Sequence, residues 1–113
     1  MEGFRRLHVY QLSLEYLQKI YNLLSEDKIK QDFSLKDQIK RASMSITANI
    51  AEGYGRSTTK DKYHFLTIAI GSTNEVMAFL DIINKIYKID TSDLNNKYEV
   101  LGKQIYNLRK VMK

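Results

Sequence analysis

Two glutamates and two histidines have the side chains best suited to acid–base or metal chemistry in this sequence. Glu52 and Glu75 could act as a catalytic acid and base if their surroundings made one carboxyl group more acidic than the other. A di-iron site in a helical bundle needs Glu-x-x-His on two helices, and neither glutamate has a histidine three residues later. His8 and His64 lack a cysteine or a second histidine at metal-ligand spacing. The sequence therefore predicts no catalytic residue, no metal site and no cofactor.

We instead expect both glutamates to form ion pairs with Arg41 or Arg56, at helix ends or at contacts between subunits. No Gly-x-Ser-x-Gly elbow and no acid–His–Ser arrangement is recognisable. The protein is therefore not expected to be an enzyme, and a nuclease or other hydrolase is only a third alternative.

The segment from Gly53 to Thr58, Gly-Tyr-Gly-Arg-Ser-Thr, superficially resembles a phosphate-binding loop. A P-loop needs a preceding strand and an earlier glycine, but Ile50 takes that glycine's place and a helical pattern precedes it. We interpret the segment as a glycine-flanked turn between two helices. A weaker alternative is that Arg56, Lys60 and the start of the next helix together attract a phosphate.

Basic residues give the clearest indication of a binding function. The chain has 18 Lys and Arg against 13 Asp and Glu, a net charge of +5. A basic surface binds nucleic acid mainly through phosphates, with strong salt dependence and little sequence preference. Alternatively, these side chains only solvate helix surfaces, and the sequence favours neither interpretation. The candidate nucleic-acid-binding residues are Lys36, Lys40, Arg41, Arg56, Lys60, Lys103, Arg109 and Lys110.

Four helical segments must position these residues. The first covers residues 7–24, with an apolar seam at Tyr10, Leu14, Leu17, Tyr21 and Leu24. Ser34 is the expected N-cap of the second, which ends near residues 53–55, where either glycine could adopt a left-handed conformation. The third is capped by Thr58 or Thr59 and runs to about residue 88, and the fourth starts at residues 91–93. The seam of the fourth is Leu94, Tyr98, Leu101, Ile105, Leu108 and Met112.

These patterns, without strand-like alternation, predict an all-α fold: an antiparallel up-down four-helix bundle in a single domain, residues 1–113. The chain has no cysteine and no recognisable export signal, so we expect a cytoplasmic protein. The longest apolar run, residues 76–80, is too short to span a bilayer, and no membrane association is expected.

The third helix has two neighbouring apolar stripes and therefore needs more than one packing partner. We predict a homo-oligomer, although the other helices of one chain could cover both stripes. Asn49 falls on a buried stripe and is expected to hydrogen-bond to a neighbouring helix, with ligand contact as the alternative. The predicted structural or interface residues are Asn49, Glu52, Gly53, Phe65, Gly71, Glu75 and Phe79. We expect the tyrosines to be core or interface anchors more often than stacking platforms.

Two blocks carry a family resemblance that covers nearly the whole chain. The first comprises Gln38, Ile39, Arg41, Ala42, Ser45, Ile46, Asn49, Ile50, Ala51, Glu52, Gly53, Gly55 and Arg56. The second comprises Phe65, Leu66, Ile68, Ala69, Gly71, Ser72 and Glu75. Together they resemble the four-helix-bundle proteins of 23S rRNA intervening sequences, a family related to the accessory variability proteins of diversity-generating retroelements. The chain lacks the tryptophan common in the family's first helix, and it has Thr47 where proline is frequent.

The resemblance implies a homopentamer associated with RNA or the ribosome, and its retroelement relatives act as partners of a reverse transcriptase. We therefore expect a non-enzymatic binding or scaffold module that presents basic helix surfaces to rRNA or another structured nucleic acid. The alternative is a protein-interaction or structural bundle, for example a reverse-transcriptase partner, with no direct role in nucleic-acid binding.

Overall fold

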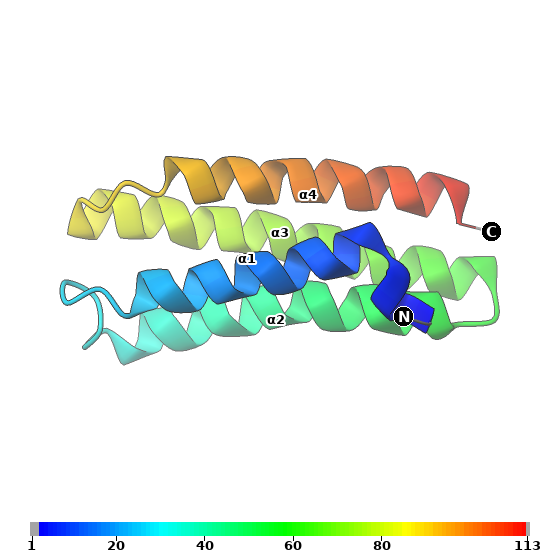
Figure 1. Cartoon of the computed structure of the whole chain (residues 1–113), viewed down its shortest axis with the longest axis horizontal. Coiled ribbons are helices and arrows are strands. Elements are labelled where there is room, and N and C mark those ends of the chain that lie inside the picture. The colour runs from blue at the N-terminus through cyan, green and yellow to red at the C-terminus, as the bar shows by residue number, and fades with distance from the viewer. Residues whose placement is uncertain (1–2, 113) are drawn as a thin grey trace.

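Four antiparallel helices form the computed structural model, which describes residues 3–112 (Figure 1). They are α1 (His8–Leu24), α2 (Phe33–Gly55), α3 (Thr59–Tyr87) and α4 (Ser92–Val111), preceded by the short 3-10 helix η1 (Gly3–Arg6). Each helix packs against two others, in the cyclic order α1, α2, α3, α4. The predicted all-α four-helix bundle is confirmed.

Helix boundaries follow the capping side chains. Asp32 caps α2 by accepting a hydrogen bond from the Leu35 backbone N–H at 3.2 Å. The expected cap, Ser34, therefore lies inside the helix. Thr58 caps α3 as predicted, because its hydroxyl accepts from the Asp61 backbone N–H at 3.1 Å. The left-handed cap expected at Gly53 or Gly55 is wrong. Both glycines are helical, and α2 instead ends in an extended residue.

The core lies along the bundle axis and is built mostly from isoleucine and leucine. Helix α2 contributes Ile39, Ile46 and Ile50, each 0% exposed. Helix α4 contributes Tyr98, Leu101 and Ile105 from its predicted seam, and the other members of that seam are partly buried against the core. Helix α3 places members of both predicted stripes in the core: Leu66, Ala69, Val76, Leu80 and Ile83.

The predicted seam of α1 is confirmed at Leu24 but is wrong by one helical position over the rest of the helix. The structure turns Val9, Ser13, Tyr16, Ile20 and Leu24 inward. Leu14 and Tyr21 are instead 44% and 41% exposed. Both lines have spacings of three and four residues, and they lie about 100° apart around the helix. Periodicity alone favoured the leucine-rich line, whereas the bundle buries the line that contains Ser13. The Ser13 hydroxyl accepts a hydrogen bond from the Thr47 hydroxyl of α2 at 3.0 Å.

Asp32 also ties the start of α2 to the end of α3. It accepts a hydrogen bond of 2.5 Å from the Tyr87 hydroxyl, which lowers the pKa of Asp32 below its usual value, and the Leu35 N–H lowers that pKa further. A carboxyl group with a lowered folded-state pKa stabilises the fold above its unfolded pKa of about 3.9. That stabilisation is lost as the pH falls through the lower, folded-state pKa.

We therefore expect Asp32→Ala to lower the melting temperature at pH 7 by more than it does at pH 2. Thermal denaturation followed by circular dichroism at several pH values measures this difference. Asp27→Ala, at an exposed carboxylate that caps no helix, is the matched control. A melting-temperature difference for Asp32→Ala that stays constant from pH 7 to pH 2 contradicts this role.

Helix α3 is long and apolar enough, by length and composition alone, to cross a bilayer. The central helix of a bundle passes the same test, and seven residues of α3 are buried against the other helices. The absence of membrane association stays a prediction.

Candidate nucleic-acid interface

The eight basic residues predicted to bind nucleic acid do not form one surface. Helix α2 runs antiparallel to α1 and α3 along a bundle 44 Å long, so its first and last turns lie at opposite ends (Figure 1). The first group, at the start of α2, is Lys36, Lys40 and Arg41. The second group, at the other end, is Arg56, Lys60, Arg109 and Lys110. Lys103 lies on α4 about two turns before Lys110.

The first group is largely engaged in contacts within the chain. Lys36 donates a hydrogen bond to the Lys30 carbonyl at 3.1 Å, and Arg41 donates to the Asp37 carboxylate at 3.0 Å. The Lys40 ammonium lies 4.9 Å from the centre of the Tyr21 ring. These exposed contacts are individually weak, and each of the three cations has a partner within its own chain.

In the second group, Arg109 builds a cluster with two exposed tyrosines. Its guanidinium lies 4.3 Å from the Tyr63 ring centre and 5.0 Å from the Tyr106 ring centre, and it donates to the Thr67 hydroxyl at 2.8 Å. Tyr63 is 52% exposed and Tyr106 is 46% exposed. Neither tyrosine is therefore a core residue of the single chain, and whether this pair anchors an interface stays a prediction. These contacts within the chain engage the Arg109 guanidinium, so it orients the two rings and is less free to bind a phosphate.

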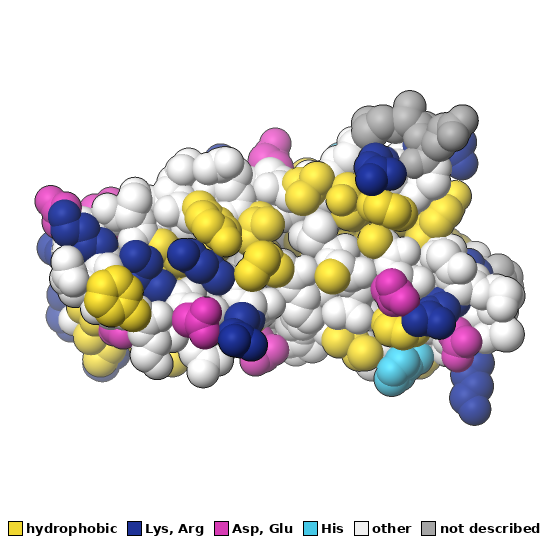
Figure 2. All heavy atoms as spheres, turned by 90° about the horizontal axis from the view of Figure 1, so that it is seen from below, with side chains coloured by type: hydrophobic (Ala, Val, Ile, Leu, Met, Phe, Trp, Pro, Cys, Tyr) yellow, Lys and Arg dark blue, Asp and Glu magenta, His cyan; other side chains and the backbone are white. Residues whose placement is uncertain are grey.

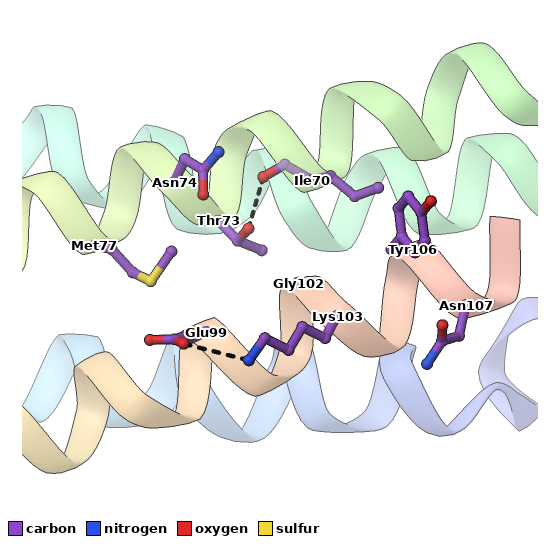
Figure 3. A pocket seen from close by; sticks show the side chains of 9 residues that line it. All are labelled: Ile70, Thr73, Asn74, Met77, Glu99, Gly102, Lys103, Tyr106 and Asn107. Carbon is purple, nitrogen blue, oxygen red and sulfur yellow. Dashed lines mark hydrogen bonds and ion pairs between the residues drawn. The ribbon is translucent and has the colours of Figure 1, made fainter.

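A groove of about 470 Å³ between α3 and α4 opens beside this cluster (Figure 3). The helices approach closely there because Gly102 has no side chain: a Cβ at Gly102 would lie 2.9 Å from the Thr73 hydroxyl. Ile70, Met77 and Tyr106 give the groove an apolar lining, and Asn74 and Asn107 are at its edges. Lys103 reaches the carboxylate of Glu99 at 3.4 Å across one helical turn. The groove thus combines an aromatic ring, amides and a cation.

The predicted structural residues lie mainly where α2 meets α3. Ser72 of α3 donates a hydrogen bond to Ser45 of α2 at 2.9 Å, and the Arg56 guanidinium lies 4.6 Å from the Phe65 ring centre. Residues spaced three or four apart from Phe65 and Ser72 extend the same side of α3 toward its end. We call this surface the α2–α3 face, and its members are Arg41, Ser45, Asn49, Glu52 and Arg56 of α2 and Phe65, Ile68, Gly71, Ser72, Glu75, Phe79, Ile82 and Ile86 of α3.

Asn49 does not bridge two helices, so that expectation is wrong. Its amide donates to the carbonyl and the hydroxyl of Ser45, at 2.8 and 3.1 Å, within α2. The residue is half-buried at the edge of the face, and its amide makes its hydrogen bonds within its own helix. Hydroxyl pairs make the side-chain hydrogen bonds between helices here: Ser45 with Ser72, and Thr47 with Ser13. Sequence reasoning missed these pairs because single serines and threonines have no distinctive spacing.

The glutamates differ in their pairing. Glu52 accepts a hydrogen bond from Arg56 at 2.6 Å, as expected. Glu75 is exposed, and within residues 3–112 no ion pair of Glu75 is found. No group of three or more potential metal ligands occurs in that part of the chain either.

The two glycines among the predicted structural or interface residues have opposite surroundings. Gly53 is buried, and a Cβ there would lie 3.3 Å from the Phe65 Cβ and 3.5 Å from the Lys62 carbonyl oxygen, so the glycine lets α3 approach α2 closely. A Cβ at Gly71 would meet nothing within 4 Å. Nothing within one chain therefore requires a glycine at position 71.

In the turn that superficially resembles a phosphate loop, residues 53–58, most nearby cations already contact groups of the same chain and are only partly available to bind a phosphate. Arg56 pairs with Glu52 and covers the Phe65 ring, while Lys62 donates to the Tyr54 carbonyl at 3.0 Å. The Thr58 hydroxyl already caps the start of α3. Lys60 is exposed. The arrangement fits the interpretation as a helix–helix turn.

Comparison with known proteins identifies the family. The family model for the 23S rRNA-intervening sequence protein matches residues 5–110. The chain belongs to this family. A crystal structure of a protein of unknown function from the S23 ribosomal protein family of Bacteroides thetaiotaomicron is similar, with a TM-score of 0.82 and 28% sequence identity. The similarity covers 91% of this chain and 99% of that one. No curated protein matches the sequence.

In this member of the family, the first motif block has two kinds of residue. Its apolar and small members Ile39, Ala42, Ile46, Ile50 and Gly53 are buried in the bundle. Its charged members lie exposed on the α2–α3 face, where Glu52 and Arg56 pair with one another. The apolar half of the block therefore builds the core, and the charged half lies at the surface.

Proposed function

We propose that this protein is a non-enzymatic RNA-binding module that assembles from several copies and binds RNA phosphates through basic helix surfaces. The observation that carries the proposal is the second half of α4, where Lys103 and Lys110 are exposed beside Tyr106 and Arg109. Lysines next to exposed aromatic rings are typical of nucleic-acid-binding surfaces. Membership of a family named after an rRNA insertion supports RNA over DNA as the ligand. It also supports association with the ribosome.

Self-association is the second part of the proposal, and the α2–α3 face is the surface we assign to it. Three isoleucines of α3, Ile68, Ile82 and Ile86, are 38%, 43% and 63% exposed in a single chain. Large apolar side chains gathered on one face usually mark an interface. Arginines and glutamates on the same face could pair between copies, since Arg41 and Glu75 keep exposed charges there.

A pentamer, the number implied by the family resemblance, would strengthen RNA binding through repetition. Five copies at +5 each carry a net charge of +25. A weak phosphate-binding surface repeated around a ring gains avidity without any new contact, provided that one RNA reaches several copies. Such a protein would act in the cytoplasm.

Fluorescence anisotropy with a labelled structured RNA and a labelled DNA duplex, from about 50 to 200 mM salt, tests this function. We expect the logarithm of the RNA association constant to fall linearly with the logarithm of the salt concentration. The slope reports how many phosphates are neutralised. Absence of RNA binding at the lowest salt concentration contradicts the proposal.

An apolar patch on the opposite flank of α2 favours a second candidate function, that of a protein-interaction scaffold. Leu14, Leu17 and Tyr21 of α1 line a shallow surface pocket, and Met44 of α2 is 43% exposed. Figure 2 views the bundle from below Figure 1 and shows hydrophobic side chains gathered midway along that side, with basic side chains beside them. The retroelement relatives suggest a reverse transcriptase as one such partner. Co-purification of a partner that survives nuclease treatment and is lost in Leu14→Glu would support this candidate.

A further inference from the structure

One line of exposed residues on α4 has the composition of a nucleotide-binding strip. Lys103, Tyr106 and Lys110 are spaced three and four residues apart, which places them on one side of the helix. All three are exposed, and Asn107 lies between them on the rim of the groove. The two lysines are separated by about 10 Å along the helix axis.

Contacts beneath the strip hold its aromatic ring in place. Arg109 contacts both Tyr106 and Tyr63, and its hydrogen bond to the Thr67 hydroxyl fixes the guanidinium against α3. Ile70 lines the groove beside Tyr106 (Figure 3). A ring that is oriented before binding loses little freedom when a planar ligand stacks on it.

We propose that Tyr106 is a stacking platform for one unpaired RNA base, while Lys103 and Lys110 bind the phosphates on either side of that nucleotide. This inference rests on the proposed RNA-binding function and specifies its substrate class as single-stranded or looped RNA. Bases within a duplex have their faces covered by neighbouring base pairs, so only an unpaired base can stack on a protein ring. Asn107 and Asn74, at the two edges of the groove, can hydrogen-bond to base edges.

The negative charge of Glu99 opposes phosphate binding by Lys103, so its removal should raise the affinity for RNA. Its carboxylate pairs with Lys103 at 3.4 Å, and both side chains are more than half exposed. Such a pair contributes little to stability, so a phosphate can replace the carboxylate. Removal of the Glu99 charge would free Lys103 and remove repulsion of the phosphate. Glu99→Gln is therefore expected to bind single-stranded RNA more tightly than the unmodified protein does.

The test compares a labelled oligouridylate of about 12 nucleotides with an RNA duplex of the same length, by fluorescence anisotropy at low salt. Tyr106→Leu removes the ring but keeps an apolar helix-forming side chain, and Tyr106→Phe keeps the ring. Tyr21→Leu is the matched control, because Tyr21 is similarly exposed and has the Lys40 ammonium over its ring, as Tyr106 has the Lys110 ammonium 5.6 Å from its ring centre. Circular dichroism verifies that each variant folds.

We expect Tyr106→Leu to weaken oligouridylate binding about fivefold to hundredfold, with duplex binding unchanged. Tyr106→Phe and Tyr21→Leu should retain the affinity of the unmodified protein. If Tyr106→Leu binds oligouridylate as tightly as the unmodified protein does, the stacking proposal is wrong while RNA binding itself stands. If the unmodified protein binds neither RNA, the stacking proposal and the proposed function both fail.

Discussion

Gly71→Arg is expected to convert the proposed assembly into monomers of 13.2 kDa without unfolding the bundle. Gly71 lies on the α2–α3 face, three residues after Ile68 and four before Glu75. A Cβ there meets nothing within 4 Å in a single chain, so an added side chain costs the monomer no packing. Glycine is also a poor helix former, by about 1 kcal/mol relative to alanine, so the substitution favours the helix. In an interface between copies, the same arginine would insert bulk and an unpaired charge.

Light scattering coupled to size-exclusion chromatography, at micromolar concentration, measures this result. Gly55→Arg is the matched control, because it adds the same side chain at a glycine that also has open space around it and lies off the α2–α3 face. We expect the mass of Gly55→Arg to equal that of the unmodified assembly. If Gly71→Arg keeps the assembled mass, the α2–α3 face is not the interface. If the unmodified protein is itself a monomer, there is no assembly to explain.

The second large effect is expected from reversing two charges on α4. The double substitution Lys103→Glu with Lys110→Glu should weaken binding of structured RNA by at least about tenfold at low salt. It should also reduce the salt slope by about two, one for each lost phosphate contact. Arg109 is kept because its contacts with Tyr63, Tyr106 and Thr67 hold the cluster together. Anisotropy titrations at several salt concentrations measure both quantities.

A matched control separates a local surface from the charge of the whole protein. Lys19→Glu with Lys85→Glu changes the net charge by the same amount at two exposed lysines of α1 and α3. We expect this control to retain most of the affinity and the full salt slope. Equal losses in the two double variants would mean that RNA responds to overall charge, and the assignment to α4 would be withdrawn.

The number and order of the helices could be predicted because each segment repeats apolar residues every three or four positions over many turns. The phase of α1 could not, because two apolar lines compete on that helix. Ser13 and Thr47 help to decide between these lines by a hydrogen bond that exists only in the packed bundle. The Asp32 cap was also missed, although Leu35 is only three residues away, and the contact of Asp32 with Tyr87, 55 residues away in the sequence, could not be predicted.

The candidate site was predictable in composition but not in arrangement. Sequence identified Lys103, Arg109 and Lys110 as a basic stretch of one helix. It could not place Tyr63 of α3 beside Arg109, since their contact depends on how the two helices align. The same alignment separates Lys36, Lys40 and Arg41 from the α4 residues, although all were assigned to one binding function. Of the eight basic residues, we therefore propose those on the strip of α4 as the binding site.

Photochemical crosslinking tests the central claim most directly. A structured RNA containing 4-thiouridine would be irradiated with the protein, digested with trypsin, and analysed by mass spectrometry for peptides that carry a nucleotide. Cleavage after Lys103 and Arg109 isolates residues 104–109, the peptide that contains Tyr106. The account predicts that this peptide, and longer fragments reaching Lys110, carry most of the crosslinked nucleotide. Crosslinks confined to the start of α2 would contradict it, and so would their absence at low salt.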